Sequence, residues 1–393
     1  MGLMLRGAYV WGIGSLDYRN LMHGHSHVAM LGWVYLALFA LIWYRFIPPI
    51  TRKKNIYEIL FYSTQVTVVG MMISFPLQGY GPWSIAFSTL NIMASYVFCY
   101  RVWKDCHIPN EGVKLMFKTS LVLLIISTLG VWSLGPLAVF GDRNSALYQI
   151  AIQFYLHFQF HGWFTFAVLA LVVNFLPELN KKFKGPMFRW FYGLLISSTL
   201  LTYALVLAWA YGGVLNLWVN GLGLILQLTA LALFLKMWIK TVQPIPPFTM
   251  SGFFFKFGLL SWVLKVLIQS VVILPEVAVI SLSIRSLMIG FIHLTMLGFI
   301  SGVLFAIFHG PGGWLGDSRF LIGGGGIFTL GFVVTELCLF VQGLFYWIQW
   351  GQIPFYYNIM FIISIFLPLG ILLIKINLIK NMIINKRHDM IYS

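Results

Sequence analysis

The stretch that decides the fold is LMHGHSHVAMLGWVYLALFALIWYRF, residues 21–46. Three of the nine histidines in the chain, His23, His25 and His27, stand at its start. The apolar run that follows has the length that a helix needs to cross a hydrocarbon core of about 30 Å, which is roughly 20 residues. The stretch therefore predicts a membrane helix whose first turns carry imidazoles.

The composition of the whole chain is that of a membrane protein. Of its 393 residues, 60% are hydrophobic and only 9% are charged, whereas a soluble domain carries about 25% charged residues. The net charge of +15 is spread over short loops, and no basic stretch is long enough for a nucleic-acid-binding tail. We expect an all-α bundle of transmembrane helices with the lipid bilayer as its partner and no nucleic acid.

Cysteine spacing and the N-terminal residues argue against a zinc ribbon, covalently attached haem and a cleavable signal peptide. Cys99, Cys106 and Cys338 form no CxxC or CxxCH motif, so neither a zinc ribbon nor covalent haem attachment is indicated. Residues 1–20 lack a cleavable signal pattern because Arg6 and Asp17 interrupt the short apolar part. We expect this segment to lie at the membrane interface.

Apolar windows predict eleven spans and leave room for a twelfth without a clear position. They lie near 22–47, 56–76, 83–103, 114–135, 146–176, 187–210, 214–238, 251–274, 285–309, 320–348 and 354–379. We expect one transmembrane domain over residues 1–393 that ends in a cytoplasmic tail at 381–393.

Loop charges predict the orientation of these spans. Lys and Arg gather in the loops after spans one, three, five and seven and at the C-terminus, whereas the alternate loops hold only Arg143 as a basic residue. This alternation follows the positive-inside rule. It predicts an N-terminus outside and a C-terminus inside, in the cytoplasmic membrane of a bacterium.

With that topology, spans one, five and nine run in the same direction, and six histidines fall in their outer halves. They are His23, His25, His27, His157, His161 and His293. The pairs His23/His27 and His157/His161 are spaced i,i+4, so each pair shares a helix face. Imidazole suits iron, copper and zinc. The alternative is that these are hydrogen-bonded packing residues, although polar groups in membranes are costly enough to suggest function.

A short echo links two of the histidines. HVAMLGW from His27 and HLTMLGF from His293 share a histidine, then Met-Leu-Gly and an aromatic residue. Gly32 and Gly298 lack a side chain, so a neighbouring helix or a flat macrocycle can come close.

Three segments resemble the catalytic subunit of haem–copper oxidases, above all the C-family, and the NnrS family of haem- and copper-containing membrane proteins. HLTMLGF is similar to the tenth oxidase helix and RNLMHGHSHVAMLGW to the second, which supply the axial histidines of the low-spin haem. HFQFHGWFTFAVLALVVNFLP is similar to the copper-binding sixth helix. Removal of the first of the twelve oxidase helices turns helices two, six and ten into spans one, five and nine.

The chain departs from the oxidase pattern at two places. Phe291 stands where the tenth helix of the oxidases carries the ligand of the high-spin haem, and FYGLLISSTLLTYALVLAWAYGG lacks the histidine pair of the seventh helix. A complete binuclear centre is therefore not expected. Whether the protein is an oxidoreductase of the oxidase or nitric oxide reductase type stays open.

The resemblance implies one b-type haem held by His27 and His293, with His25 as the substitute for His27. It implies a separate metal site, copper by preference, at His157 and His161 with His23 as a third ligand. As an alternative, one residue of that pair ligates a second haem. Arginines at the outer surface either pair with the haem propionates or anchor the interface; they are Arg19, Arg143 and Arg285.

Three functions compete for this sequence. The first is redox chemistry or the handling of nitric oxide or O2, with a quinol or a cytochrome as electron donor. The second is a non-redox transporter or metal-ion-binding protein that uses the same histidines, and the third is an assembly or sensing component. Lys265 and Glu336, both near the middle of a span, suggest an ion pair or a proton path because an isolated charge there is expensive.

Overall fold

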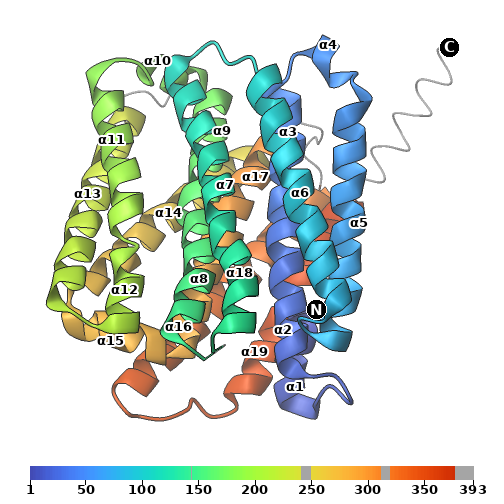
Figure 1. The fold of residues 1–393 in the computed structure, drawn as a ribbon, viewed down its shortest axis with the longest axis vertical. Coiled ribbons are helices and arrows are strands. Elements are labelled where there is room, and N and C mark those ends of the chain that lie inside the picture. Colours follow the sequence, from blue (N-terminus) through green and yellow to red (C-terminus); the bar gives the residue numbers. More distant parts are fainter. Residues whose placement is uncertain (143, 240–248, 311–318, 377–393) are drawn as a thin grey trace. The chain divides into compact units, whose positions relative to one another are not determined.

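The structure is a computed structural model that describes residues 1–142, 144–239, 249–310 and 319–376 (Figure 1). Within these ranges every regular element is a helix, and eleven helices are long and apolar enough to cross a membrane. The prediction of eleven spans in a multi-pass integral membrane protein is confirmed. Arg143 and the predicted tail at 381–393 lie outside the described residues.

The spans agree with the predicted ones to within a few residues. They are Tyr18–Phe46, Asn55–Gln78, Pro82–Asp105, Glu111–Phe140, Ala146–Phe175, Gly185–Tyr211, Val214–Ile239, Met250–Ile273, Arg285–Phe308, Arg319–Trp347 and Tyr356–Ile376. The first begins earlier than predicted because Asp17 caps it, its carboxylate accepting the Asn20 N–H at 2.8 Å. A hydropathy window does not register such a polar first turn.

Several spans consist of more than one helical element. Span one contains α2 (Tyr18–His27), η1 (Val28–Val34) and α3 (Tyr35–Phe46); span five contains α8 (Ala146–His157), η2 (Phe158–Phe164) and α9 (Thr165–Phe175). Span six contains α11 (Gly185–Leu201) and α12 (Ala204–Tyr211); span eight contains α14 (Met250–Ser270) and η3 (Val271–Ile273). Span nine contains α16 (Arg285–His293), η4 (Leu294–Ile300) and α17 (Ser301–Phe308).

The remaining spans, shorter helices and connections complete the chain. The spans are α5 (Asn55–Gln78), α6 (Pro82–Asp105), α7 (Glu111–Phe140), α13 (Val214–Ile239), α18 (Arg319–Trp347) and the last span, which begins with α19 (Tyr356–Ser364). The short helices are α1 (Gly2–Trp11), α4 (Pro49–Arg52), α10 (Pro177–Lys182) and α15 (Pro275–Ser283).

A π-helical segment interrupts each of the three histidine-bearing spans. The segments η1, η2 and η4 begin directly after His27, His157 and His293. Each has a glycine five residues past its histidine, followed by an aromatic residue, so HFQFHGW is a third copy of the echo seen in the sequence. π-Helical segments are rare in proteins, but those that occur are often found at functional sites. These three spans are therefore the candidates for a functional site.

The glycines of the three copies lie at close helix contacts. A Cβ on Gly32 would come within 2.8 Å of Val68 Cγ1, and one on Gly162 within 3.0 Å of Leu123 Cβ. A Cβ on Gly298 would come within 2.7 Å of Ser261 Oγ. Neighbouring side chains therefore fill the space that each missing side chain leaves, which favours the packing role of these glycines.

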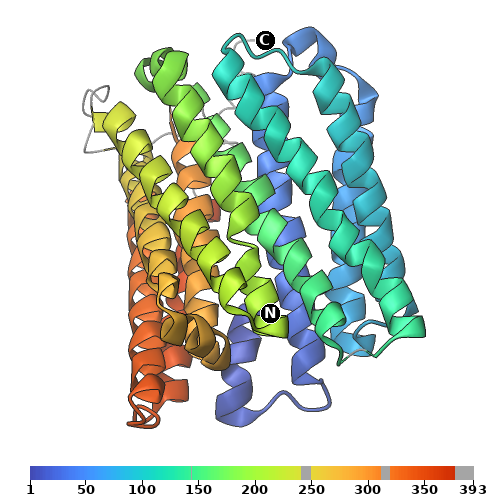
Figure 2. The same cartoon turned by 60° about the vertical axis from the view of Figure 1, so that its left-hand side comes forward.

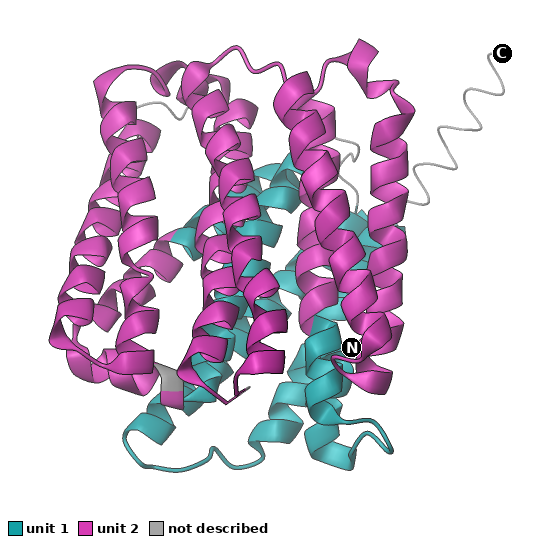
Figure 3. Cartoon of the chain, in the orientation of Figure 1, with its two compact units in different colours: residues 1–25, 244–262, 284–393 teal, residues 26–243, 263–283 magenta. Residues whose placement is uncertain are grey.

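The described chain divides into two compact units (Figure 3). Unit 1 comprises residues 1–25, 244–262 and 284–393, and unit 2 comprises 26–243 and 263–283. In unit 2, α5 packs on α6, and α7 packs on α8, η2 and α9. The helices α11 and α13 of unit 2 run side by side (Figure 2).

Unit 1 is built on α16, α18 and the last span. The helix α18 packs against α16 and α19, and α1 packs on α19 through Tyr9 and Tyr357, whose rings stack at 4.4 Å. The run of four glycines in α18 allows close packing, since a Cβ on Gly324 would come within 2.8 Å of the Gly370 carbonyl oxygen. The N-terminal segment thus contains a helix, and its first residues belong to the same unit as His293.

Candidate functional site

The first cluster lies in unit 1 around His293, at the end of α16. Its Nδ1 is 3.5 Å from Oε1 of Glu336 on α18. Glu336 is buried, and within the described part of the chain neither of its carboxylate oxygens has a hydrogen-bond partner. The two groups are therefore neighbours at the outer limit of hydrogen-bonding distance. This arrangement directs the Nδ1 edge of the imidazole toward the carboxylate and leaves the Nε2 edge on the opposite side.

Two residues near the N-terminus belong to the same cluster. Electrostatic interactions connect His25 with His293 and with Arg6, and Arg6 with both His293 and Glu336. The backbone of α1 lies against His25, because a Cβ on Gly2 would come within 3.1 Å of His25 Cε1. The sequence argument treated Arg6 only as an interruption. A single arginine in a short apolar segment carries no sequence signal of its neighbours in the fold.

The other predicted residues of unit 1 lie at its polar edge. Arg285 is exposed, with its guanidinium 5.6 Å from the Tyr18 ring centre and one nitrogen 3.0 Å from Met22 Sδ. Arg19 is exposed and interacts electrostatically with His23. A role of Arg19 and Arg285 toward haem propionates stays a prediction.

The second cluster lies in unit 2 around His157 and His161, whose ring centres are 4.8 Å apart. His157 Nε2 is 2.8 Å from the Thr199 carbonyl oxygen. His161 Nδ1 is 2.8 Å from Nζ of Lys265, which is only 2% exposed. The predicted pairing of the two histidines on one helix face is confirmed, and a buried lysine is the neighbour that the sequence did not assign to them.

A break in span six makes the Thr199 carbonyl available. In a continuous α-helix this oxygen would accept the N–H of Tyr203, four residues on. Here α11 ends at Leu201, and the Tyr203 N–H points to Leu200 O at 3.4 Å. The released carbonyl oxygen can only accept a hydrogen bond, so in this contact His157 is the donor and carries its proton on Nε2.

The two clusters differ in how well they fit a cofactor. A histidine that ligates a metal through one nitrogen usually donates its other N–H to a carboxylate or carbonyl. In unit 1, Glu336 lies beside His293 Nδ1 at 3.5 Å, without a hydrogen bond between them. In unit 2, His157 makes such a hydrogen bond but His161 does not, because an amine faces its Nδ1. Among the described residues, no three or more His, Cys, Asp or Glu side chains lie together as ligands of a metal ion.

His27, the first choice as axial ligand, belongs to unit 2. Its ring stacks on Phe75 at 4.2 Å and lies 6.1 Å from the Tyr80 ring. These aromatic contacts give it a packing environment within that unit. Its pairing with His293 stays a prediction from the sequence, as does the part of His23 in a copper site.

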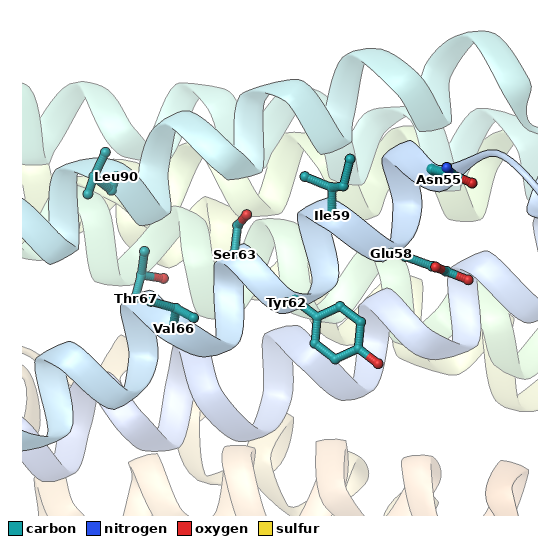
Figure 4. A pocket seen from close by; sticks show the side chains of 8 residues that line it. All are labelled: Asn55, Glu58, Ile59, Tyr62, Ser63, Val66, Thr67 and Leu90. Carbon is teal, nitrogen blue, oxygen red and sulfur yellow. The ribbon is translucent and has the colours of Figure 1, made fainter.

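A groove in unit 2 lies along α5 (Figure 4). Its volume is about 720 Å³, and it is lined by Asn55, Glu58, Ile59, Tyr62, Ser63, Val66, Thr67 and Leu90. None of the candidate histidines lines it, so the groove adds nothing to the chemistry of the site.

No protein-family model and no curated protein matches this chain.

Proposed function

We propose that the chain is a haem-binding redox protein of the haem–copper oxidase or NnrS type, with one b-type haem ligated by His293. The orientation of His293 carries this proposal. Its Nδ1 faces the Glu336 carboxyl group at 3.5 Å, so Nε2, on the opposite side of the ring, is the nitrogen that would bind the iron. A carboxylate in this position fixes the tautomer of an axial imidazole and increases its basicity.

His25 is the opposite axial ligand in this proposal. It belongs to unit 1 with His293, and the two interact electrostatically. Arg6 contributes a positive charge to the same cluster, which suits a haem propionate. The sequence predicted His27 as the ligand, with His25 as its substitute. We prefer His25 because it belongs to the same unit as His293, whereas His27 belongs to unit 2.

Two axial imidazoles favour electron transfer over gas binding. The haem, when bound, supplies the redox chemistry, while the protein supplies ligation, orientation and charge. With both axial positions taken, nitric oxide or O2 can bind only after one imidazole has left. We therefore propose electron transfer from a quinol or a cytochrome, in a bacterial cytoplasmic membrane with the N-terminus outside, as the principal activity.

The first experiment is a reduced-minus-oxidised spectrum of the purified protein with pyridine haemochrome quantitation. We expect one low-spin b-type haem per chain and no change on addition of carbon monoxide to the reduced protein. A carbon monoxide shift would favour gas handling. A chain that stays colourless after supplementation with haem would overturn the proposal and favour the transporter alternative.

Substitutions identify the second axial ligand. We expect His25→Ala to abolish the low-spin spectrum and His27→Ala to retain it. His107→Ala is the matched control, because His107 is exposed and its backbone N–H, which donates to Phe46 O at 2.8 Å, is kept in the variant. If His27→Ala alone removes the spectrum, the pairing first predicted from the sequence is the right one.

A further inference from the structure

We propose that Lys265 is a tethered cation that takes the place of a metal ion at the His157–His161 pair. The lysine Nζ lies 2.8 Å from His161 Nδ1, inside hydrogen-bonding range. Lys265 is 2% exposed and comes from α14, so a residue distant in sequence is held at the pair by the packing of unit 2.

The contact with Lys265 determines what His161 can bind. A lysine ammonium has three donors and no acceptor, so it donates to the lone pair on His161 Nδ1. The proton of the neutral imidazole then sits on Nε2. In this state His161 has no lone pair left for a metal ion.

The neighbouring histidine is restricted in a different way. His157 donates its Nε2–H to the Thr199 carbonyl at 2.8 Å, which leaves Nδ1 as its one acceptor nitrogen. The pair therefore offers a metal ion one lone pair instead of two. A second cation would also be repelled by the ammonium, and this repulsion is strong where little water is present to screen it.

The inference gives the pair a ligand of defined chemistry, which is the primary amine of the chain itself. It also accounts for an i,i+4 histidine pair that resembles a copper-binding segment but meets a lysine. It does not depend on the haem of unit 1, because all four groups involved, His157, His161, Thr199 and Lys265, belong to unit 2.

The test removes the amine and measures copper. Purified full-length protein is treated with a copper(II) salt, desalted and subjected to elemental analysis, with a copper EPR spectrum as the second readout. We expect substoichiometric copper on the unsubstituted protein. Lys265→Leu and Lys265→Gln should both gain close to one copper ion per chain, with nitrogen hyperfine structure in the EPR spectrum.

Two variants serve as controls for the site of this gain. Lys265→Arg keeps a cation and should gain nothing, and Lys265→Leu/His161→Ala should lose the gain. Lys265→Gln keeps a polar side chain next to His161, so it remains informative if Lys265→Leu fails to fold. Unsubstituted protein that holds one copper ion, lost in His157→Ala/His161→Ala, would overturn the inference. A folded Lys265→Gln variant that binds no more copper than the unsubstituted protein would overturn it as well.

Discussion

Two histidines in similar local structures face partners of opposite kind, one an acid and one a base. His293 in unit 1 faces the carboxylate of Glu336, whereas His161 in unit 2 faces the amine of Lys265. His293 directly precedes a π-helical segment and His161 lies inside one. Spans five and nine, which carry these two histidines, are the most buried of the eleven.

The difference indicates that the neighbouring side chain decides whether an imidazole nitrogen is available to bind a metal. A carboxylate that accepts a hydrogen bond from one ring N–H makes the other ring nitrogen a better ligand. An amine donates to one ring nitrogen and competes with any metal cation. Both histidines lie at π-helical segments, so the chemistry of one neighbouring side chain separates a candidate ligand from a site that already holds an amine.

The largest expected effect comes from removal of the two histidines themselves. His293→Ala should abolish the low-spin haem spectrum, because it removes a direct ligand. His161→Ala should leave the haem spectrum intact. Haem content per chain, measured on both variants, tests the comparison directly, and loss of haem in His161→Ala would break it.

Exchange of the partner charge is the next test. Lys265→Glu gives His161 a carboxylate in place of the amine and should allow copper to bind with one ion per chain. Glu336→Lys places an amine beside His293 and should prevent haem incorporation. Copper and haem contents are measured on both variants. If the partner charge has no influence on either content, the difference between the two histidines has another cause.

A smaller effect is expected when Glu336 is neutralised without a change of shape. Glu336→Gln keeps an acceptor oxygen near His293 but loses the negative charge, and loss of such a partner typically costs about 10- to 100-fold in affinity. We expect weaker haem retention and a higher reduction potential, because the negative charge stabilises the oxidised iron. Haem titration and potentiometry measure both quantities; an unchanged potential would show that Glu336 is not charged beside the haem.

The smallest effect concerns the helix packing that supports unit 1. Gly324→Ala brings a methyl group within 2.8 Å of the Gly370 carbonyl oxygen, and overpacking of this kind costs about 1–3 kcal/mol. Gly326→Ala is the control, because its Cβ would meet nothing within 4 Å. The midpoint temperature of thermal unfolding in detergent should be lowered by Gly324→Ala and unchanged by Gly326→Ala. Equal midpoints would show that α18 and the last span can separate without cost.

Much of the fold followed from the sequence, because membrane insertion depends on local length and hydrophobicity. All eleven spans were predicted, and the start of the first was misplaced where a polar cap, Asp17, precedes the apolar run. The histidine pair on one face of α8 and η2 was also predicted, since i,i+4 spacing fixes it. The third copy of the histidine echo was missed because HFQFHGW lacks the Met-Leu that the other two copies share.

The partners of the histidines could not be predicted in the same way. Lys265 and Glu336 stood out in the sequence as costly charges near the middle of their spans, but hydropathy does not report the direction in which a helix face points. The contact of Lys265 with His161 joins two spans of unit 2 that are far apart in sequence, and the contact of Glu336 with His293 depends on how α18 packs on α16 in unit 1. The carbonyl of Thr199 became an acceptor only through the break between α11 and α12.

The sequence by itself thus determined that this protein is a bundle of membrane helices with histidines gathered in three of them. Composition and periodicity are properties of a segment, so they are readable without neighbours. Only the tertiary structure decided that one histidine meets a carboxyl group and another an amine, because the group beside a side chain is supplied by a different helix.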